Sequence, residues 1–155
     1  MTYRHKSRAL AVRESSRAVP QIYAEMADVA LLAALIPSVR RCFEVQDRWR
    51  WEMKTYRALG LSVTPEFDVD AVFSNEQGVR FRPVGEVTEG ARGEGEIGLT
   101  AGRIGADFLT EIRIEMTVTV DLQLPRMLGS AVGRIVTREV RQVIDDLADR
   151  LASGT

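Results

Sequence analysis

The chain of 155 residues has a single cysteine, Cys42, and a single histidine, His5. One cysteine cannot form an internal disulfide, so the sequence is compatible with a reducing compartment. Zinc sites draw several ligands from cysteine and histidine, and a catalytic nucleophile needs an activating base. With His5 expected in a mobile terminal segment, we expect no bound metal, no cofactor and no histidine-assisted nucleophile. We expect Cys42 to be a structural residue of a strand.

Long hydrophobic runs are also missing. No apolar stretch reaches the roughly 18 residues that a membrane helix needs. The first ten residues are basic but lack the apolar segment of a secretory signal, so we expect a cytoplasmic protein without a transmembrane segment. The hydrophobic fraction of 45% and the charged fraction of 28% are typical of a globular protein. Together with the length they predict a single domain over residues 1–155, with an ordered core of about residues 7–151.

A net charge of −1 conceals an uneven distribution. Residues 1–57 carry 11 basic and 6 acidic side chains, whereas residues 58–155 carry 10 and 16. A basic first part could attract nucleic acid or anionic lipid. Its basic residues are dispersed, however, and only Arg40 and Arg41 are adjacent. We therefore interpret this part as a solvated face, and we do not expect nucleic-acid binding.

Alternating apolar and polar side chains predict antiparallel strands with one apolar face and one wet face. The expected strands are residues 8–14, 39–45, 48–57, 66–73, 79–84, 91–101 and 111–122. Gln46 and Asp47 fit a tight hairpin turn, and residues 102–105 fit another. Gly93, Gly95 and Gly98 interrupt one strand, and we expect them to let the sheet bend.

Two short helices are expected after the first strand. Ser15 and Ser16 offer N-cap chemistry, and Pro20 suits the first turn of a helix. Asp28 is expected to cap a second short helix, which Pro37 ends.

A long helix is expected at the end of the chain. From Pro125 to about Leu151, apolar residues recur every three or four positions and form one stripe. At 1.5 Å per residue such a helix would be about 40 Å long. It is the only expected element large enough to cover the apolar face of the sheet.

This order of elements resembles the START/SRPBCC superfamily, whose helix-grip fold wraps a curved sheet around a long helix and leaves an apolar cavity. The segment after the first strand resembles the opening of polyketide cyclase/dehydrase-like and coenzyme Q-binding members. The matching residues are Pro20, Tyr23, Asp28, Ile36, Pro37 and Val39. The resemblance implies an α+β helix-grip domain with six to seven antiparallel strands. The iron ligands of the ring-hydroxylating members are missing, so we expect no metal-dependent oxygenase.

The resemblance also implies that apolar strand residues line a cavity. We expect ten residues on or near the concave face: Trp49, Trp51, Met53, Phe67, Val69, Phe73, Phe81, Ile112, Ile114 and Met116. Taken singly, each is more typical of an ordinary core. Thr55 and Tyr56 are polar candidates for the same cavity, and the strand register that decides between them is left open.

Acidic residues alternate along two of the expected strands. Asp68 and Asp70, and likewise Glu94 and Glu96, fall on the face opposite the apolar one. Oxygen ligands of this kind suit hard cations, but we expect these side chains in solvent rather than around a metal.

Three functions remain open. The leading expectation is the binding of a hydrophobic small molecule, such as a lipid, quinone or polyketide-like compound, between the sheet and the C-terminal helix. The alternative is an aromatase/cyclase- or dehydratase-type enzyme, which would need Tyr, Arg, Asp or Glu as acid or base in the cavity. A second alternative is an interaction or assembly factor that uses the basic first part. The catalytic residues, the ligand and the oligomeric state are not assigned.

Overall fold

The computed structural model describes residues 2–84, 90–103 and 105–154. Seven antiparallel strands form one sheet in the order β1-β9-β8-β7-β6-β3-β2. These strands are β1 (Thr2–Ser15), β2 (Val39–Val45), β3 (Arg48–Met53), β6 (Glu66–Ser74), β7 (Gly78–Pro83), β8 (Gly90–Ala101) and β9 (Thr110–Gln123). A separate hairpin pairs β4 (Tyr56–Ala58) with β5 (Leu61–Val63). The helices are α1 (Val19–Met26), α2 (Val29–Ala34) and α3 (Gly129–Ser153), the last preceded by a 3₁₀ turn, η1 (Arg126–Leu128).

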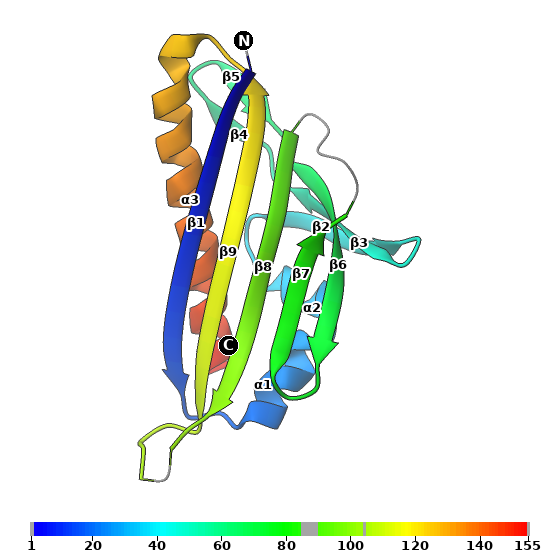
Figure 1. Ribbon diagram of the computed structural model, residues 1–155, viewed down its shortest axis with the longest axis vertical. Coiled ribbons are helices and arrows are strands. Elements are labelled where there is room, and N and C mark those ends of the chain that lie inside the picture. The colour runs from blue at the N-terminus through cyan, green and yellow to red at the C-terminus, as the bar shows by residue number, and fades with distance from the viewer. Residues whose placement is uncertain (1, 85–89, 104, 155) are drawn as a thin grey trace.

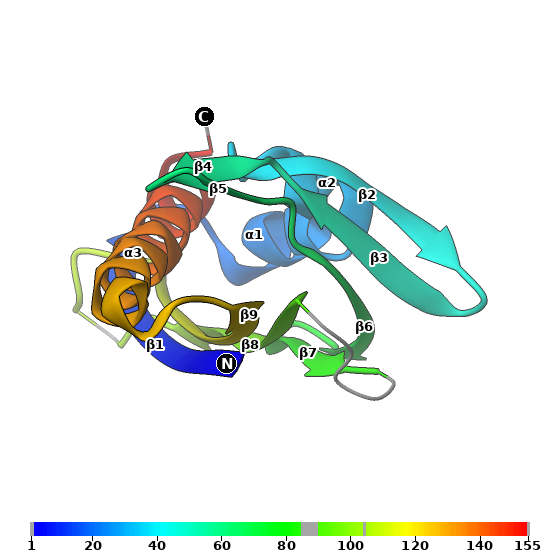
Figure 2. The same ribbon diagram turned by 90° about the horizontal axis from the view of Figure 1, so that it is seen from above.

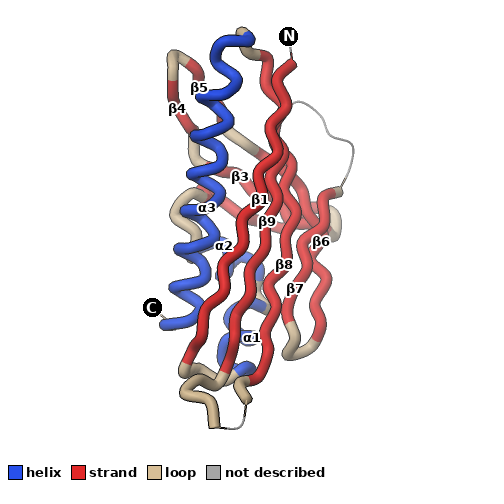
Figure 3. Tube along the Cα trace, turned by 60° about the vertical axis from the view of Figure 1, so that its left-hand side comes forward, coloured by secondary structure: helices blue, strands red, loops and turns tan. Residues whose placement is uncertain are grey.

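The sheet curves, and the helices lie on its concave side. Helix α3 runs beside the long strands β1 and β9 (Figure 1 and Figure 3) and packs against both. Viewed from above, the sheet bends through β6 and β3 to β2, and the β4–β5 hairpin extends toward α3 (Figure 2). Helix α1 contacts β7 and β8, while α2 contacts β2. This confirms the predicted α+β helix-grip arrangement, with two short helices after the first strand. No helix in the described part of the chain is long and apolar enough to cross a membrane.

Local sequence chemistry accounts for several elements. In β9, Ile112 and Ile114 are buried whereas Arg113 between them is exposed, as the alternation predicts. Gln46 and Asp47 join β2 to β3 with φ values of 49° and 66°. Two positive φ values in a row are those of a type I′ hairpin turn, which suits the twist of the flanking strands. The alternation of buried and exposed side chains, together with the turn residues, therefore accounts for most of the sheet.

Strand β1 is longer than predicted. It begins at Thr2 rather than Arg8, because β9 offers a partner along its whole length, from Thr2 opposite Gln123 to Ser15 opposite Thr110. The expectation of a mobile His5 was therefore wrong. Its Nε2 atom lies 3.0 Å from the Thr137 hydroxyl of α3.

The predicted N-cap of α1 was also wrong. The capping position is Ala18, whose backbone N–H donates to the Gln21 side chain at 3.1 Å. The Ser15 hydroxyl instead donates to the Ala152 carbonyl at 2.6 Å and ties β1 to the end of α3. At the next helix the prediction is confirmed, since Asp28 accepts a hydrogen bond from the backbone N–H of Leu31 at 3.2 Å.

Three other boundaries differ. The strand expected over residues 48–57 ends at Met53, and the chain then forms the β4–β5 hairpin, which the sequence pattern did not predict. The turn predicted at 102–105 is a longer connection, closed by a bond from Gly102 N–H to the Leu109 carbonyl; residue 104 lies outside the described residues. The long helix begins at Gly129, since η1 takes up the residues directly after Pro125.

Candidate functional site

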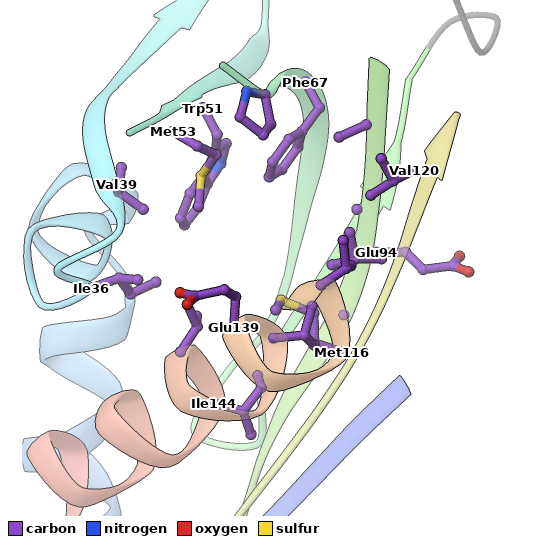
Figure 4. Close-up of a pocket in the computed structure, with 18 of the residues that line it drawn as sticks. Ile36, Val39, Trp51, Met53, Phe67, Glu94, Met116, Val120, Glu139 and Ile144 are labelled. Atoms are coloured by element: carbon purple, nitrogen blue, oxygen red, sulfur yellow. The ribbon is translucent and has the colours of Figure 1, made fainter. Parts of the chain in front are cut away.

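A cavity of about 200 Å³ lies between the concave face of the sheet, α3, α2 and the β4–β5 hairpin. Its walls are almost entirely apolar. Helix α3 contributes Val132, Ile135, Val136, Val140, Val143, Ile144 and Leu147. Figure 4 shows Ile36 and Val39 on the opposite wall, beyond the end of α2. A cavity lined in this way favours apolar ligands, because burying their surface releases water.

An aromatic cluster forms one wall of the cavity. Trp51 on β3 lies parallel to Phe67 on β6, with 6.2 Å between ring centroids and 8° between the planes. Phe81 on β7 meets Trp51 edge to face at 5.8 Å and 80°. Such pairs add about 0.5–1.5 kcal/mol beyond the burial of their area. The cluster therefore gives the cavity a flat wall that is held from three strands.

Glycine makes room for this cluster on β8. A Cβ atom added to Gly93 would lie 3.2 Å from the ring of Phe67. The absence of a side chain thus lets the ring approach the strand closely. Strand β8 pairs with β9 without a shift in register, so the glycines cause no bulge along this pairing.

Seven of the ten residues expected on the concave face line the cavity: Trp51, Met53, Phe67, Val69, Phe81, Ile114 and Met116. The other three lie elsewhere. Trp49 is partly buried against the core, and Ile112 is fully buried within it. Phe73 lies near the end of β6 and is 37% exposed. Alternation along a strand does not show where the cavity ends, and these three residues lie beyond its lining.

Tyr56 and Leu61 of the β4–β5 hairpin also line the cavity. Thr55 does not, since its hydroxyl pairs with that of Thr64 at 2.7 Å in an exposed position. The open choice between Thr55 and Tyr56 is thereby settled in favour of Tyr56. The rest of this wall was not predicted from the sequence, because strands of three residues carry no recognisable period.

Two glutamates among the lining residues differ in direction (Figure 4). Glu94 is exposed on β8, and its carboxylate points away from the cavity. Glu139 extends from α3 toward Ile36 on the opposite wall. Glu139 was not among the predicted site residues, although its spacing of three residues from Val136 and four from Val143 places it on the apolar stripe. The apolar wall of α3 therefore contains one carboxylate.

Trp51 has a polar atom without a partner. Its indole Nε1 is buried and is the one such side-chain atom in the described residues that lacks a hydrogen bond. An unpaired buried N–H costs about 1–3 kcal/mol. The aromatic cluster accordingly holds a hydrogen-bond donor that the folded chain leaves unused.

Other reactive groups are buried or already paired. Burial raises the pKa of the half-buried Cys42 thiol to about 12, so the thiol stays protonated at neutral pH. A hydrogen bond of 2.9 Å from Arg50 lowers the pKa of Asp68, and Arg80 pairs with Glu96 at 2.8 Å. Within residues 2–84, 90–103 and 105–154, no group of three or more His, Cys, Asp or Glu could hold a metal ion.

Comparison with known proteins bears on the fold. No family model matches the chain, and no curated protein matches it. Among solved structures, the Zhui aromatase/cyclase from Streptomyces sp. R1128 has a TM-score of 0.62 at 10% identity, over 97% of this chain and 93% of that one. A START superfamily protein from Mycobacterium smegmatis has a TM-score of 0.59 at 13% identity, over 96% and 99%. A Deinococcus radiodurans protein has 0.61 at 16%, over 97% and 99%. The chain therefore shares the helix-grip fold of these structures.

Proposed function

We propose that the protein binds a hydrophobic small molecule, such as a lipid, quinone or polyketide-like compound, between the sheet and α3. The observation that carries this proposal is the apolar cavity of about 200 Å³ with its aromatic wall. A ligand that buries about 200 Å² of apolar surface gains about 5 kcal/mol, before the entropic cost of association. The START superfamily protein among the structural neighbours supports a ligand-binding role.

A second candidate is an aromatase/cyclase- or dehydratase-type enzyme that acts on a polyketide-like substrate. Tyr56 on the hairpin and Glu139 on α3 are ionisable residues at the cavity, and they favour this candidate. A phenol and a carboxylate could donate and accept protons during ring closure or loss of water. The aromatase/cyclase among the structural neighbours supports the same candidate.

An interaction role through the basic first part of the chain gains no comparable support. The adjacent pair Arg40 and Arg41 is engaged with Glu52 at 2.8 and 3.1 Å. Arg50 is engaged with Asp68. Basic side chains that neutralise acidic neighbours offer less charge to a partner.

Native mass spectrometry of protein purified from its own host tests the proposal. We expect a lipophilic molecule to remain bound to the wild type. Val118→Phe adds volume inside the cavity, and Val72→Phe makes the same change at a position that is 42% exposed on β6. The first variant should lose the molecule and the second should keep it.

The outcome also separates the two candidates. Retention of the molecule by Val118→Phe, or its absence from the wild type across several growth conditions, would contradict binding in this cavity. Incubation with a linear poly-ketone that yields a cyclised or dehydrated product would favour the enzyme. Release of the same compound unchanged favours a binding protein.

A further inference from the structure

Glu139 interrupts the face that α3 turns toward the cavity. Val136 and Val140 precede and follow it, and Val143 lies one turn further along the same face. With about 3.6 residues per turn, Val136, Glu139 and Val143 lie one above the other on the same stripe. A carboxylate among apolar side chains loses part of its hydration, and this loss is offset only by a partner of opposite polarity.

The described residues supply no close partner for this carboxylate. Its nearest cation is Arg138, at 4.0 Å and with 74% of its side chain exposed. Other acidic groups are paired far more closely, as in the 2.9 Å contact between Asp68 and Arg50 or the 2.8 Å contact between Glu96 and Arg80. The Glu139 side chain is 34% exposed, so it is neither freely solvated nor satisfied within the fold.

The Glu139 carboxylate and the aromatic cluster lie on different sides of the cavity. Figure 4 shows the carboxylate pointing from α3 toward Ile36, while Trp51 and Phe67 lie on the sheet side. A long ligand can therefore place an apolar body against the aromatic wall and a polar end beside Glu139.

We infer that Glu139 makes the cavity selective for amphipathic ligands whose polar end is a hydrogen-bond donor, a hydroxyl or a protonated amine. An ionised carboxylate only accepts hydrogen bonds, so the ligand must bring the donor. A ligand that ends in a carboxylate meets like charge in a partly dehydrated site and is rejected. This inference rests on the proposed function and specifies its ligand class.

Three probes with one eight-carbon chain test the inference: 1-octylamine, 1-octanol and octanoate. Each is titrated against the wild type carrying the neutral fluorophore N-phenyl-1-naphthylamine, and displacement gives its Kd. We expect octylamine to bind most tightly and octanoate about tenfold more weakly than octanol, because charge-assisted hydrogen bonds exceed neutral ones and like charges repel. In Glu139→Gln, octanoate should come within about twofold of octanol, and octylamine should lose its advantage.

Glu94→Gln provides the matched control, because it removes the same charge from a carboxylate that points away from the cavity. It should leave the order of the three probes unchanged. The inference would be overturned if the affinity order of the three probes stayed the same in Glu139→Gln, or if Glu94→Gln changed that order equally. In either case, binding of octanol would still support the proposed function. Failure of the fluorophore and all three probes to bind the folded wild type would overturn both.

Discussion

The interior of the domain has two ends that are packed differently. Where α1 meets the sheet and the last turns of α3, Ile22, Met26, Ile112 and Leu151 are completely buried. Beside the β4–β5 hairpin and the part of α3 from Val132 to Leu147, side chains instead surround a space of about 200 Å³. Close packing at one end supplies contacts that stabilise the fold, and the other end is free to accept a ligand. We therefore expect stability and binding to respond to different substitutions.

The largest expected effect on stability is at the densely packed end of the domain, where α1 meets the sheet. Ile22→Ala removes a side chain with 0% exposure from α1 and should lower the free energy of unfolding by about 2–5 kcal/mol, as large-to-small core changes do. Ile135→Ala makes the same change on α3, where the side chain is partly exposed and borders the cavity. It should cost less than half as much, because part of the space beside it is already empty.

Urea unfolding followed by circular dichroism measures both variants. Equal losses for Ile22→Ala and Ile135→Ala would show that the two ends are packed alike. That result would argue against the cavity as the binding site.

A smaller effect is expected where α3 meets β1. A Cβ atom at Gly133 would lie 2.7 Å from the Tyr3 hydroxyl and 2.8 Å from Nδ1 of His5. Alanine in place of glycine normally stabilises a helix by about 1 kcal/mol, but here it displaces both side chains. Gly133→Ala should therefore lower the free energy of unfolding, by about 1 kcal/mol, in the same urea experiment. Arg134→Ala, on the exposed side of the helix, should change it by less than about 0.5 kcal/mol, and a stabilised Gly133→Ala would contradict the close contact.

The contact between β1 and α3 also shows which parts of the fold could be predicted from the sequence and which could not. Regular alternation, as at Ile112 and Ile114, predicted most strands to within two residues, because burial on one face selects every second side chain. The first half of β1 escaped prediction, since its inward positions are Tyr3, His5 and Ser7. Polar groups are buried there because they pair with Thr137, which lies far along the chain.

The site could be predicted only in part, for a similar reason. Trp51, Phe67 and Met116 follow from strand periodicity, which assigns a face to each residue. The hairpin residue Tyr56 and the helix residue Glu139 depend on how distant elements pack. Apart from the helical spacing of Glu139, no local sequence pattern predicts that these two residues lie at the cavity. Tertiary packing therefore decides which polar groups lie at the cavity, and we attribute the proposed selectivity to one of them, Glu139.

The smallest effect on stability, but a measurable one on binding, is expected on β8. In Gly93→Ala the new methyl group would lie 3.2 Å from the Phe67 ring, so the ring would have to shift. In Gly98→Ala on the same strand, the nearest atom is the Arg113 carbonyl oxygen at an ordinary 3.9 Å. The first variant should weaken octanol binding about fourfold, the equivalent of about one buried methylene group, and the second should leave it unchanged. Titration with the fluorescent displacement assay measures both, and equal affinities in the two variants would mean that the aromatic wall does not contact the ligand.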